Sequence, residues 1–334
     1  MDKIEDEFSM FEKNLVLGYF YLKEFQFESG AVLKDLKVEY TTIGNKILNK
    51  NGEITNVVLY FHGLGENCLD ISKIQDIIGK NKSLDTDKFF IISITTLGSP
   101  NSHSPSNSSL KNKFPSYTIK DMINFHKEFL ESKFKIKHVK GLIGYSMGGF
   151  ESLEWGTLYP DYMDFIISIA SSYKISSESY ILLKLVNQII EKDPDYNDGD
   201  YENPLKSVGI ANQLVFPFSL SQKFYNQFIS NEEIDKQLAI LKNAFSEYDG
   251  NDVILRGNAV SKYNVENKLE NIIAKTLIVA INQDLFFPPE FNAVPMNKLI
   301  KESKLVFFDS LFGHSGIKEI GKIENELKSF LAGF

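Results

Sequence analysis

The stretch that most constrains the fold is residues 138–155, HVKGLIGYSMGGFESLEW, where a strand-like run meets a helix-like run through closely spaced glycines. Residues 138–144 have the composition of a strand. Met147, Phe150 and Leu158 then recur at a spacing that indicates one face of a helix. A chain that passes directly from a strand into a helix in this way predicts an α/β fold.

Strand and helix patterns alternate over most of the remaining chain. Residues 16–27 and 32–44 are rich in β-branched and aromatic residues and predict two strands with a turn between them. Continuous apolar runs predict further buried strands at residues 57–63, 89–95, 163–170, 275–281 and 304–309. Helical spacing lies between several of these runs, so the sequence predicts a mostly parallel central sheet flanked by helices.

The strand pattern disappears between residues 172 and 262. Residues 181–190 are strongly apolar. The spacing of an amphipathic helix follows, at Ile234, Leu238, Leu241 and Phe245. We therefore expect a helical cap insertion at 172–262, with residues 1–171 and 263–334 forming the two parts of one core. A length of 334 residues, of which 43% are hydrophobic, suits one large α/β domain with such an insertion.

Composition limits the partners that the chain can have. The net charge is −8 and no basic stripe offsets it, so we expect no nucleic-acid partner. The longest apolar runs are too short to span a bilayer, and residues 1–10 are charged and lack the apolar core of a secretion signal. We therefore expect no membrane partner and a cytoplasmic location.

The sequence predicts neither a metal site nor a bound cofactor. Residues 193–201, DPDYNDGDY, resemble a calcium loop, but Asp198 stands where that loop needs glycine and Pro204 where it needs glutamate. No cluster of histidine, cysteine and carboxylate residues indicates zinc. The one cysteine, Cys68, cannot form an intrachain disulfide, and we expect a small buried or half-buried side chain rather than a catalytic thiol.

Ser146 is the candidate nucleophile. Residues 144–148, GYSMG, fit the G-x-S-x-G pattern of a nucleophile elbow, in which a sharp strand-to-helix turn lifts the serine hydroxyl clear of the sheet. Glycine is needed on both sides because a side chain there would collide with neighbouring backbone. The alternative interpretation is a glycine-rich turn that carries no chemistry.

Asp284 and His314 are the candidate acid and base. A serine hydroxyl becomes a nucleophile only when a base accepts its proton and an acid orients that base. The chain order Ser, Asp or Glu, His is typical of the elbow motif. Asp284 and His314 follow two successive predicted strands, at the ends where ligand-facing loops emerge. Asp309 is the alternative acid, but it lies within or at the tail of its strand, so we prefer Asp284.

The other four histidines are expected outside the proton-transfer chemistry. His103 lies in the serine-rich loop and is expected in solvent, and His126 is expected to face water from its helix. His138 precedes the elbow strand and is expected to be structural. His62 is expected to brace the loop that follows the third strand.

That loop, His62-Gly63-Leu64-Gly65, also predicts half of an oxyanion hole. A loop with the sequence H-G at this position commonly contributes a backbone amide, and the residue after the nucleophile contributes a second. We therefore predict the amides of Leu64 and Met147 as the two donors.

Several motifs together resemble the homoserine O-acetyltransferase branch of the α/β-hydrolase superfamily. They are FESGAVLKDLKVEYTTIG, GSPNSHSPSN with FPSYTIKDM, GYSMGGFESLEW with YPD, DPDYNDGDY, and INQDLFFPP followed by GH. The resemblance runs over most of the chain and implies an α/β-hydrolase fold. It also implies that Ser146, Asp284 and His314 form a triad that acts through a covalent acyl-serine. Related enzymes commonly dimerise through the cap, which implies a possible homodimer.

The chain also departs from this branch. The acetyltransferases hold the homoserine carboxylate with a cap arginine in a tyrosine-arginine-serine segment, whereas the corresponding residues 215–224, VFPFSLSQKF, contain no arginine. Arg256 is the only arginine in the chain, and Ser315 replaces the aspartate that usually follows the catalytic histidine. Lysine reproduces the bidentate recognition of a carboxylate poorly.

These observations lead to one preferred function and two alternatives. We expect a serine-dependent hydrolase of a small-molecule acyl ester. The first alternative is an O-acyltransferase of the homoserine O-acetyltransferase type, with acetyl-CoA as the donor. The second is an α/β-hydrolase fold that binds a partner without catalysis, which the intact order of serine, aspartate and histidine disfavours.

Overall fold

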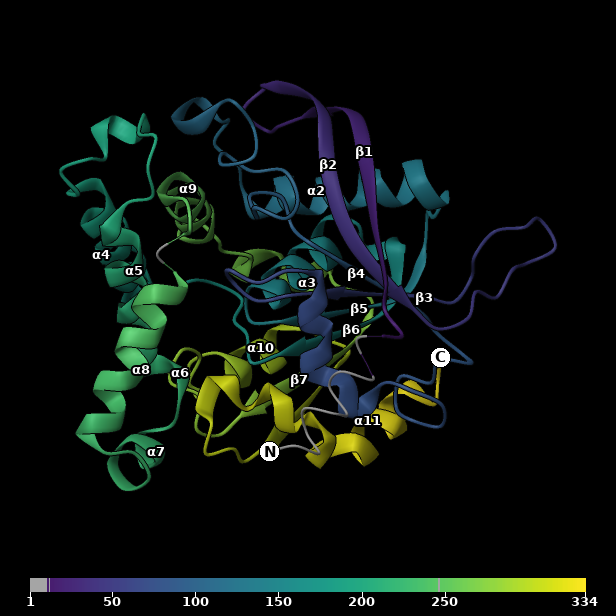
Figure 1. The fold of residues 1–334 in the computed structure, drawn as a ribbon. Coiled ribbons are helices and arrows are strands. Elements are labelled where there is room, and N and C mark those ends of the chain that lie inside the picture. The colour runs from purple at the N-terminus through teal and green to yellow at the C-terminus, as the bar shows by residue number, and fades with distance from the viewer. Residues whose placement is uncertain (1–10, 12, 246) are drawn as a thin grey trace.

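The centre of the described structure is an eight-stranded sheet with the strand order β1-β2-β4-β3-β5-β6-β7-β8 (Figure 1). The computed structural model describes residues 11, 13–245 and 247–334, so the segment 1–10 lies outside the described residues. The strands are β1 (Val16–Gln26), β2 (Val32–Ile43), β3 (Val57–Phe61), β4 (Phe90–Ile94), β5 (Val139–Tyr145), β6 (Met163–Ile169), β7 (Lys275–Ile281) and β8 (Ser303–Phe308). β2 pairs antiparallel with β1 and β4, whereas the neighbours from β4 to β8 pair parallel. The predicted mostly parallel sheet is confirmed.

Helices cover both faces of this sheet. On one face lie α2 (Ile119–Phe129), α3 (Met147–Leu158) and α10 (Ala293–Leu299). On the other lie the 3-10 helices η1 (Cys68–Ile77) and η8 (Gly313–Ile323), followed by α11 (Glu324–Leu331). Shorter helical turns are η2 (Lys111–Lys113), η3 (Leu130–Phe134), η4 (Pro160–Tyr162), η5 (Asn197–Gly199), η6 (Gln213–Val215) and η7 (Glu266–Asn271).

Strand β3 shows why the central strands are continuous apolar runs. Leu59 and Phe61 join the hydrophobic core beneath α2 and α3, whereas Val58 and Tyr60 join the core beneath η1 and η8. Successive strand residues point to opposite faces, so a strand between two helical layers has no solvent-facing side. All five residues of β3 are buried accordingly.

Helix α2 begins with a capping box formed by Thr118 and Asp121. The Thr118 side chain accepts a hydrogen bond from the Asp121 amide, and the Asp121 carboxylate accepts one from the Thr118 amide. This reciprocal pair satisfies two backbone donors that the first turn of a helix leaves free. Asp121 also accepts a hydrogen bond from the Glu28 amide at 2.8 Å, which ties the turn between β1 and β2 to the helix.

The chain between β6 and β7 forms a group of helices that stands to one side of the sheet, at the left of Figure 1. They are α4 (Ser177–Glu191), α5 (Lys206–Asn212), α6 (Phe216–Ser219), α7 (Gln222–Gln227), α8 (Asn231–Ala244) and α9 (Gly250–Val260). We call this group, residues 177–260, the cap. It has a small core of its own, made of Val186, Ile190, Leu205, Val208, Ala211 and Ile254. None of the helices described is both long and apolar enough to cross a membrane.

Trp155 provides a test of the core beneath α3. Its side chain is fully buried and stacks on Phe61 of β3, with ring centroids 5.8 Å apart. We expect Trp155→Ala to lower the free energy of unfolding by about 3–5 kcal/mol, because it removes buried apolar surface and leaves a cavity. Denaturant titration followed by circular dichroism measures this change.

The matched control for this substitution is Phe291→Ala, because the Phe291 side chain is 69% exposed. Its free energy of unfolding should stay within about 0.5 kcal/mol of that of the parent chain. Equal losses in the two variants would contradict the placement of Trp155.

Candidate active site

The turn between β5 and α3 holds Ser146 in a strained backbone conformation. Its φ is 56° and its ψ is −119°, outside the regions that residues with a Cβ usually adopt. The Ser146 amide donates to the Ile169 carbonyl at 3.0 Å, and the Ser171 hydroxyl donates to the Ser146 carbonyl at 2.8 Å. Contacts with β6 and the residues that follow it therefore hold the turn in place.

The two glycines of the motif are required by close packing. A Cβ on Gly144 would lie 2.0 Å from the Gly148 carbonyl oxygen. A Cβ on Gly148 would lie 2.1 Å from the carbonyl oxygen of Phe61 and 2.8 Å from that of His62. The structure therefore shows the predicted steric need for these glycines. The absence of a side chain at Gly148 lets the elbow pack directly against the end of β3.

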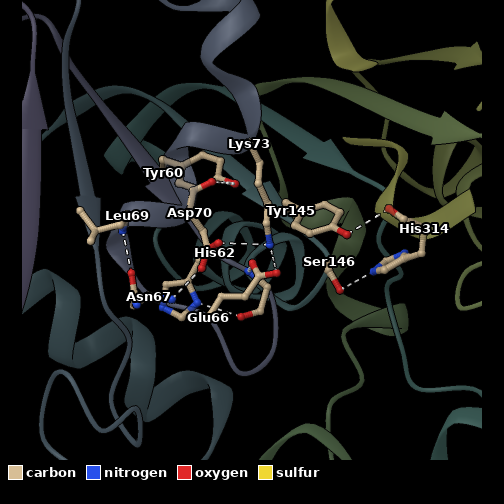
Figure 2. Close-up of polar contacts among 11 residues, drawn as sticks. Tyr60, His62, Glu66, Asn67, Leu69, Asp70, Lys73, Tyr145, Ser146 and His314 are labelled. Carbon is tan, nitrogen blue, oxygen red and sulfur yellow. Dashed lines mark hydrogen bonds and ion pairs between the residues drawn. The ribbon is translucent and has the colours of Figure 1, made fainter. Parts of the chain in front are cut away.

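Ser146, His314 and Asp284 form one hydrogen-bonded chain. The Ser146 hydroxyl lies 3.0 Å from Nε2 of His314, as Figure 2 shows. Nδ1 of the same ring lies 2.8 Å from Oδ2 of Asp284. Because an ionised carboxylate can only accept, Nδ1 carries the hydrogen and Nε2 is free to accept the hydroxyl proton. The structure thus brings together the three residues that the sequence selects.

The Asp284 carboxylate is fixed by backbone donors. The amides of Phe286 and Phe287 donate to its Oδ1 at 2.8 and 3.0 Å, which leaves Oδ2 for His314. The alternative acid Asp309 is exposed and accepts hydrogen bonds from the side chains of Asn282 and Gln283. These bonds lower the pKa of Asp309, and its carboxylate is used in holding the loop after β7.

Tyr145 joins the elbow to the His314 loop, a contact that the sequence did not reveal. Its hydroxyl donates to the His314 carbonyl at 3.0 Å, and its ring stacks on the imidazole with centroids 5.2 Å apart. Burial raises the pKa of Tyr145 well above its usual value, so the phenol remains a neutral donor. The rings of Phe286 and Phe287 pack edge-on against the imidazole, with ring centroids 4.9 and 5.5 Å from its own. Three aromatic rings therefore fix the orientation of His314.

The two residues whose amides are the predicted oxyanion donors, Leu64 and Met147, line one cavity. Met147 is the first residue of α3, so its amide has no acceptor within the helix. Leu64 lies in the loop after β3, and both residues line the cavity with Ser146. Such paired amides can stabilise the negative charge of a tetrahedral intermediate.

His62 braces this loop in a defined tautomer. The Thr96 amide donates to Nε2 at 3.1 Å, so the ring hydrogen is on Nδ1, which donates to the Gly63 carbonyl at 2.8 Å. Burial lowers the pKa of His62 and keeps the ring neutral. The expected bracing position of His62 is what the structure has.

A charged cluster beside the loop was not found by sequence reasoning (Figure 2). The Glu66 carboxylate accepts a hydrogen bond from the Gly63 amide at 2.9 Å, next to the predicted donor Leu64. Lys73 forms an ion pair with Glu66 and a second with Asp70 at 3.2 Å. The sequence does place Glu66 directly after the H-G loop and Lys73 seven residues later. It does not show that the chain folds back so that Glu66 meets both the Gly63 amide and Lys73.

Three other histidines differ in their surroundings. His126 was expected in water but is fully buried, with Nε2 2.7 Å from the Glu151 carboxylate. That expectation is wrong because its position, four residues after Met122, is on the apolar face of α2. His103 is half-buried with its ring 5.7 Å from that of Phe114, so the expectation of a solvated ring is also wrong. His138 is exposed and bridges two groups of the β6 region, Asp161 and Asp164.

The triad opens into a cavity of about 510 Å³ between the sheet and the cap. Ser146 and His314 line it together with residues of α4, α9 and the turn before α6. The arrangement provides a hydroxyl and an imidazole that can accept its proton, in a cavity that Leu64 and Met147 also line. These groups are sufficient for attack on an ester or thioester carbonyl.

The sequence model of the alpha/beta hydrolase fold matches residues 56–319, so the chain belongs to the α/β-hydrolase family. The chain is 41% identical to a probable acyltransferase of Methanothermobacter thermautotrophicus over 95% of this chain and 98% of that protein. It is 28% identical to a homoserine O-acetyltransferase of Methanococcoides burtonii over 92% of this chain and 72% of that protein. The solved structure of an acetylester hydrolase from Corynebacterium glutamicum has a TM-score of 0.84 and 26% identity, and covers 95% of this chain and 96% of its own.

These comparisons confirm the predicted fold and family. Within the family, the chain lies in the branch that resembles the homoserine O-acetyltransferases. It is an enzyme of the α/β-hydrolase class, whose relatives act on small-molecule acyl substrates. The relatives include both an acyltransferase and an ester hydrolase. The comparisons therefore define the class of enzyme, and both water and an alcohol are candidates for the final acyl acceptor.

The surroundings of Cys68, three residues after the His62-Gly63-Leu64-Gly65 loop, provide a test of whether its thiol is reactive. The thiol is fully buried at the start of η1 and lies 3.8 Å from the Glu39 carboxylate. Burial raises the pKa of Cys68 to about 12, so at about pH 8 the thiol stays protonated. We expect iodoacetamide to leave Cys68 of the folded chain unmodified, as measured by mass spectrometry, while the denatured chain is alkylated fully. Equal alkylation rates in the two states would show that the thiol is accessible and ionised.

Proposed function

We propose that the chain is a serine-dependent ester hydrolase that acts on a small-molecule acyl ester through a covalent acyl-serine. The observation that carries this proposal is the chain of contacts from the Ser146 hydroxyl to His314 at 3.0 Å and from His314 to Asp284 at 2.8 Å. No cofactor or metal is needed for this reaction, because the base, the nucleophile and the amide donors all come from the chain.

The first half of the reaction transfers the acyl group to Ser146. The Ser146 oxygen attacks the carbonyl carbon while Nε2 of His314 takes the hydroxyl proton. Asp284 stabilises the imidazolium that forms, and the amides of Leu64 and Met147 donate to the oxyanion. Each such donor contributes roughly 3 kcal/mol to lowering the barrier. His314 then returns the proton to the leaving alcohol or thiol, and the C–O or C–S bond breaks.

The second half releases the acyl group to an acceptor, and the surroundings of His314 support water in that role. Residues 215–224 occupy the place of the arginine segment in the resemblance, and Val215 and Ser219 of this segment line the cavity. Phe218 of the same segment packs 5.5 Å from Phe286, whose ring contacts His314. The segment therefore lines the cavity with Val215 and Ser219 and backs Phe286 with the ring of Phe218, so it offers no arginine partner for a homoserine carboxylate.

Acyl transfer to an alcohol is the second candidate function. It is favoured by the 41% identity with a probable acyltransferase over nearly the whole of both chains. The same triad, cavity and amide donors serve both reactions, since only the deacylating nucleophile differs.

The role of Ser146 is tested by active-site labelling. We expect a fluorophosphonate probe to modify the parent chain at Ser146, because His314 activates that hydroxyl and the amide donors stabilise the phosphoryl oxygen. Ser146→Ala should abolish labelling, as read by mass spectrometry of the intact chain. Ser221→Ala is the matched control, because its hydroxyl donates to the Leu311 carbonyl outside the hydrogen-bonded triad. Labelling that persists in Ser146→Ala would remove Ser146 from the mechanism.

The acceptor is tested by supplying both substrates. We expect the chain to cleave p-nitrophenyl acetate in water at a rate that does not depend on homoserine. Incubation with acetyl-CoA and homoserine should yield no more O-acetylhomoserine than a reaction with Ser146→Ala, as measured by mass spectrometry. Product formation that depends on both homoserine and Ser146 would establish the acyltransferase in place of the hydrolase.

A further inference from the structure

The cavity at Ser146 extends far beyond the space that an acetyl group fills. Its volume of about 510 Å³ lies within the range of roughly 300–1,000 Å³ found for pockets that enclose ligands of drug size. An acetyl group presents a single methyl beyond its carbonyl carbon. The remaining space is bordered by two cap helices, α4 and α9, so their side chains define what else can enter.

Helix α4 turns one continuous face toward the cavity. The lining residues of this helix are Ser179, Leu182, Leu183, Val186 and Asn187. Their spacing of three and four residues is that of one side of a helix. Leu182 and Leu183 are only half-buried and line the cavity, so part of their apolar surface is open to it.

Helix α9 packs against α4 and forms the adjoining part of the wall with the same spacing, through Val253, Arg256, Gly257 and Val260. Arg256 is the one charged residue of this wall, and its Nη1 donates to the Gly98 carbonyl of the core at 3.3 Å. Gly257 lets α9 pack closely against α4, since a Cβ there would lie 3.1 Å from Oδ1 of Asn187. The side of the packed pair that faces the cavity is mostly apolar.

We propose that the substrate ester carries an unbranched apolar chain of several carbons, on its acyl or its alcohol side, which lies in the cavity along the faces of α4 and α9 that line it. This inference rests on the proposed function, since it places the ester carbonyl at Ser146. A chain in this position covers the exposed apolar surface of Leu182, Leu183 and Val253. Burial of each methylene group should raise kcat/KM about four-fold.

Two series of esters test this proposal and distinguish the two sides of the ester. The first varies the acyl group of p-nitrophenyl esters from acetate through butanoate to hexanoate. The second keeps the acetyl group and varies the alcohol from methanol to hexanol. We expect kcat/KM to rise on the order of a hundredfold from the shortest to the longest member of at least one series. Flat or falling profiles in both series would overturn the proposal.

A pair of variants tests whether this gain comes from the cap. Leu182→Trp fills part of the cavity and should lower the ratio of kcat/KM for hexanoate to that for acetate by about tenfold or more. Leu185→Trp is the matched control, because Leu185 lies on the same helix but is 44% exposed. Its ratio should equal that of the parent chain. An unchanged ratio in Leu182→Trp would show that the chain binds elsewhere.

Two further comparisons separate this proposal from its rivals. The adipate monoester has the length of the hexanoate ester with a carboxylate at its end, and we expect it to react more slowly than hexanoate. Faster reaction of the adipate ester would identify an anion site at Arg256 and overturn the apolar one.

The burst of nitrophenolate reports acylation of the serine whichever acceptor follows. Acetate cleavage with a flat chain-length profile overturns this inference alone, whereas no acylation by any ester overturns the proposed function as well.

Discussion

The backbone of Ser146, at φ 56°, lies in a region that residues with a Cβ rarely adopt, and the site is built around the contacts that hold it there. Such strain costs on the order of 1–3 kcal/mol and persists only where the surrounding structure fixes it. Gly148 presses against the carbonyl oxygens of Phe61 and His62, the residues that lead into the Leu64 loop. The Ser146 turn and the Leu64 loop are therefore packed as one unit, so a shift of one would disturb the other.

The other half of the site follows from the parallel order of the sheet. β5, β6, β7 and β8 are neighbours, so the loops that follow them emerge at one edge. Asp284 follows β7 and His314 follows β8 at the edge where Ser146 follows β5. Tyr145 then bonds the elbow to the His314 loop at 3.0 Å, which couples the position of the base to that of the nucleophile.

Sequence reasoning succeeds here where a residue type is dictated by local constraints. Buried strands, the glycines of the elbow and the order of the triad residues all depend on chain geometry that a pattern expresses directly. It fails at His126 and Glu151, whose pairing joins residues 25 positions apart on two helices that pack together. The spacing of His126 matched the apolar face of α2, but its polar side chain was taken to need water. In the structure the buried Glu151 carboxylate, and not water, is the hydrogen-bond partner of His126. The pattern of a single helix cannot reveal a partner that lies on another helix.

The placement of charge in the cap bears on what the enzyme can distinguish. Asp252 accepts hydrogen bonds from Ser104 and Ser106 of the serine-rich loop, and Arg256, one turn later on α9, donates to Gly98 of the same part of the chain. Both charged side chains of this helix segment thus fasten the cap to the core. Most of the other side chains that α4 and α9 turn toward the cavity are apolar. Contacts of this kind discriminate by length and shape, at about 0.8 kcal/mol for each methylene group, and they reject polar analogues weakly. A wall that selects in this way suits an enzyme whose second substrate is water, because water needs no binding site that recognises a charged acceptor.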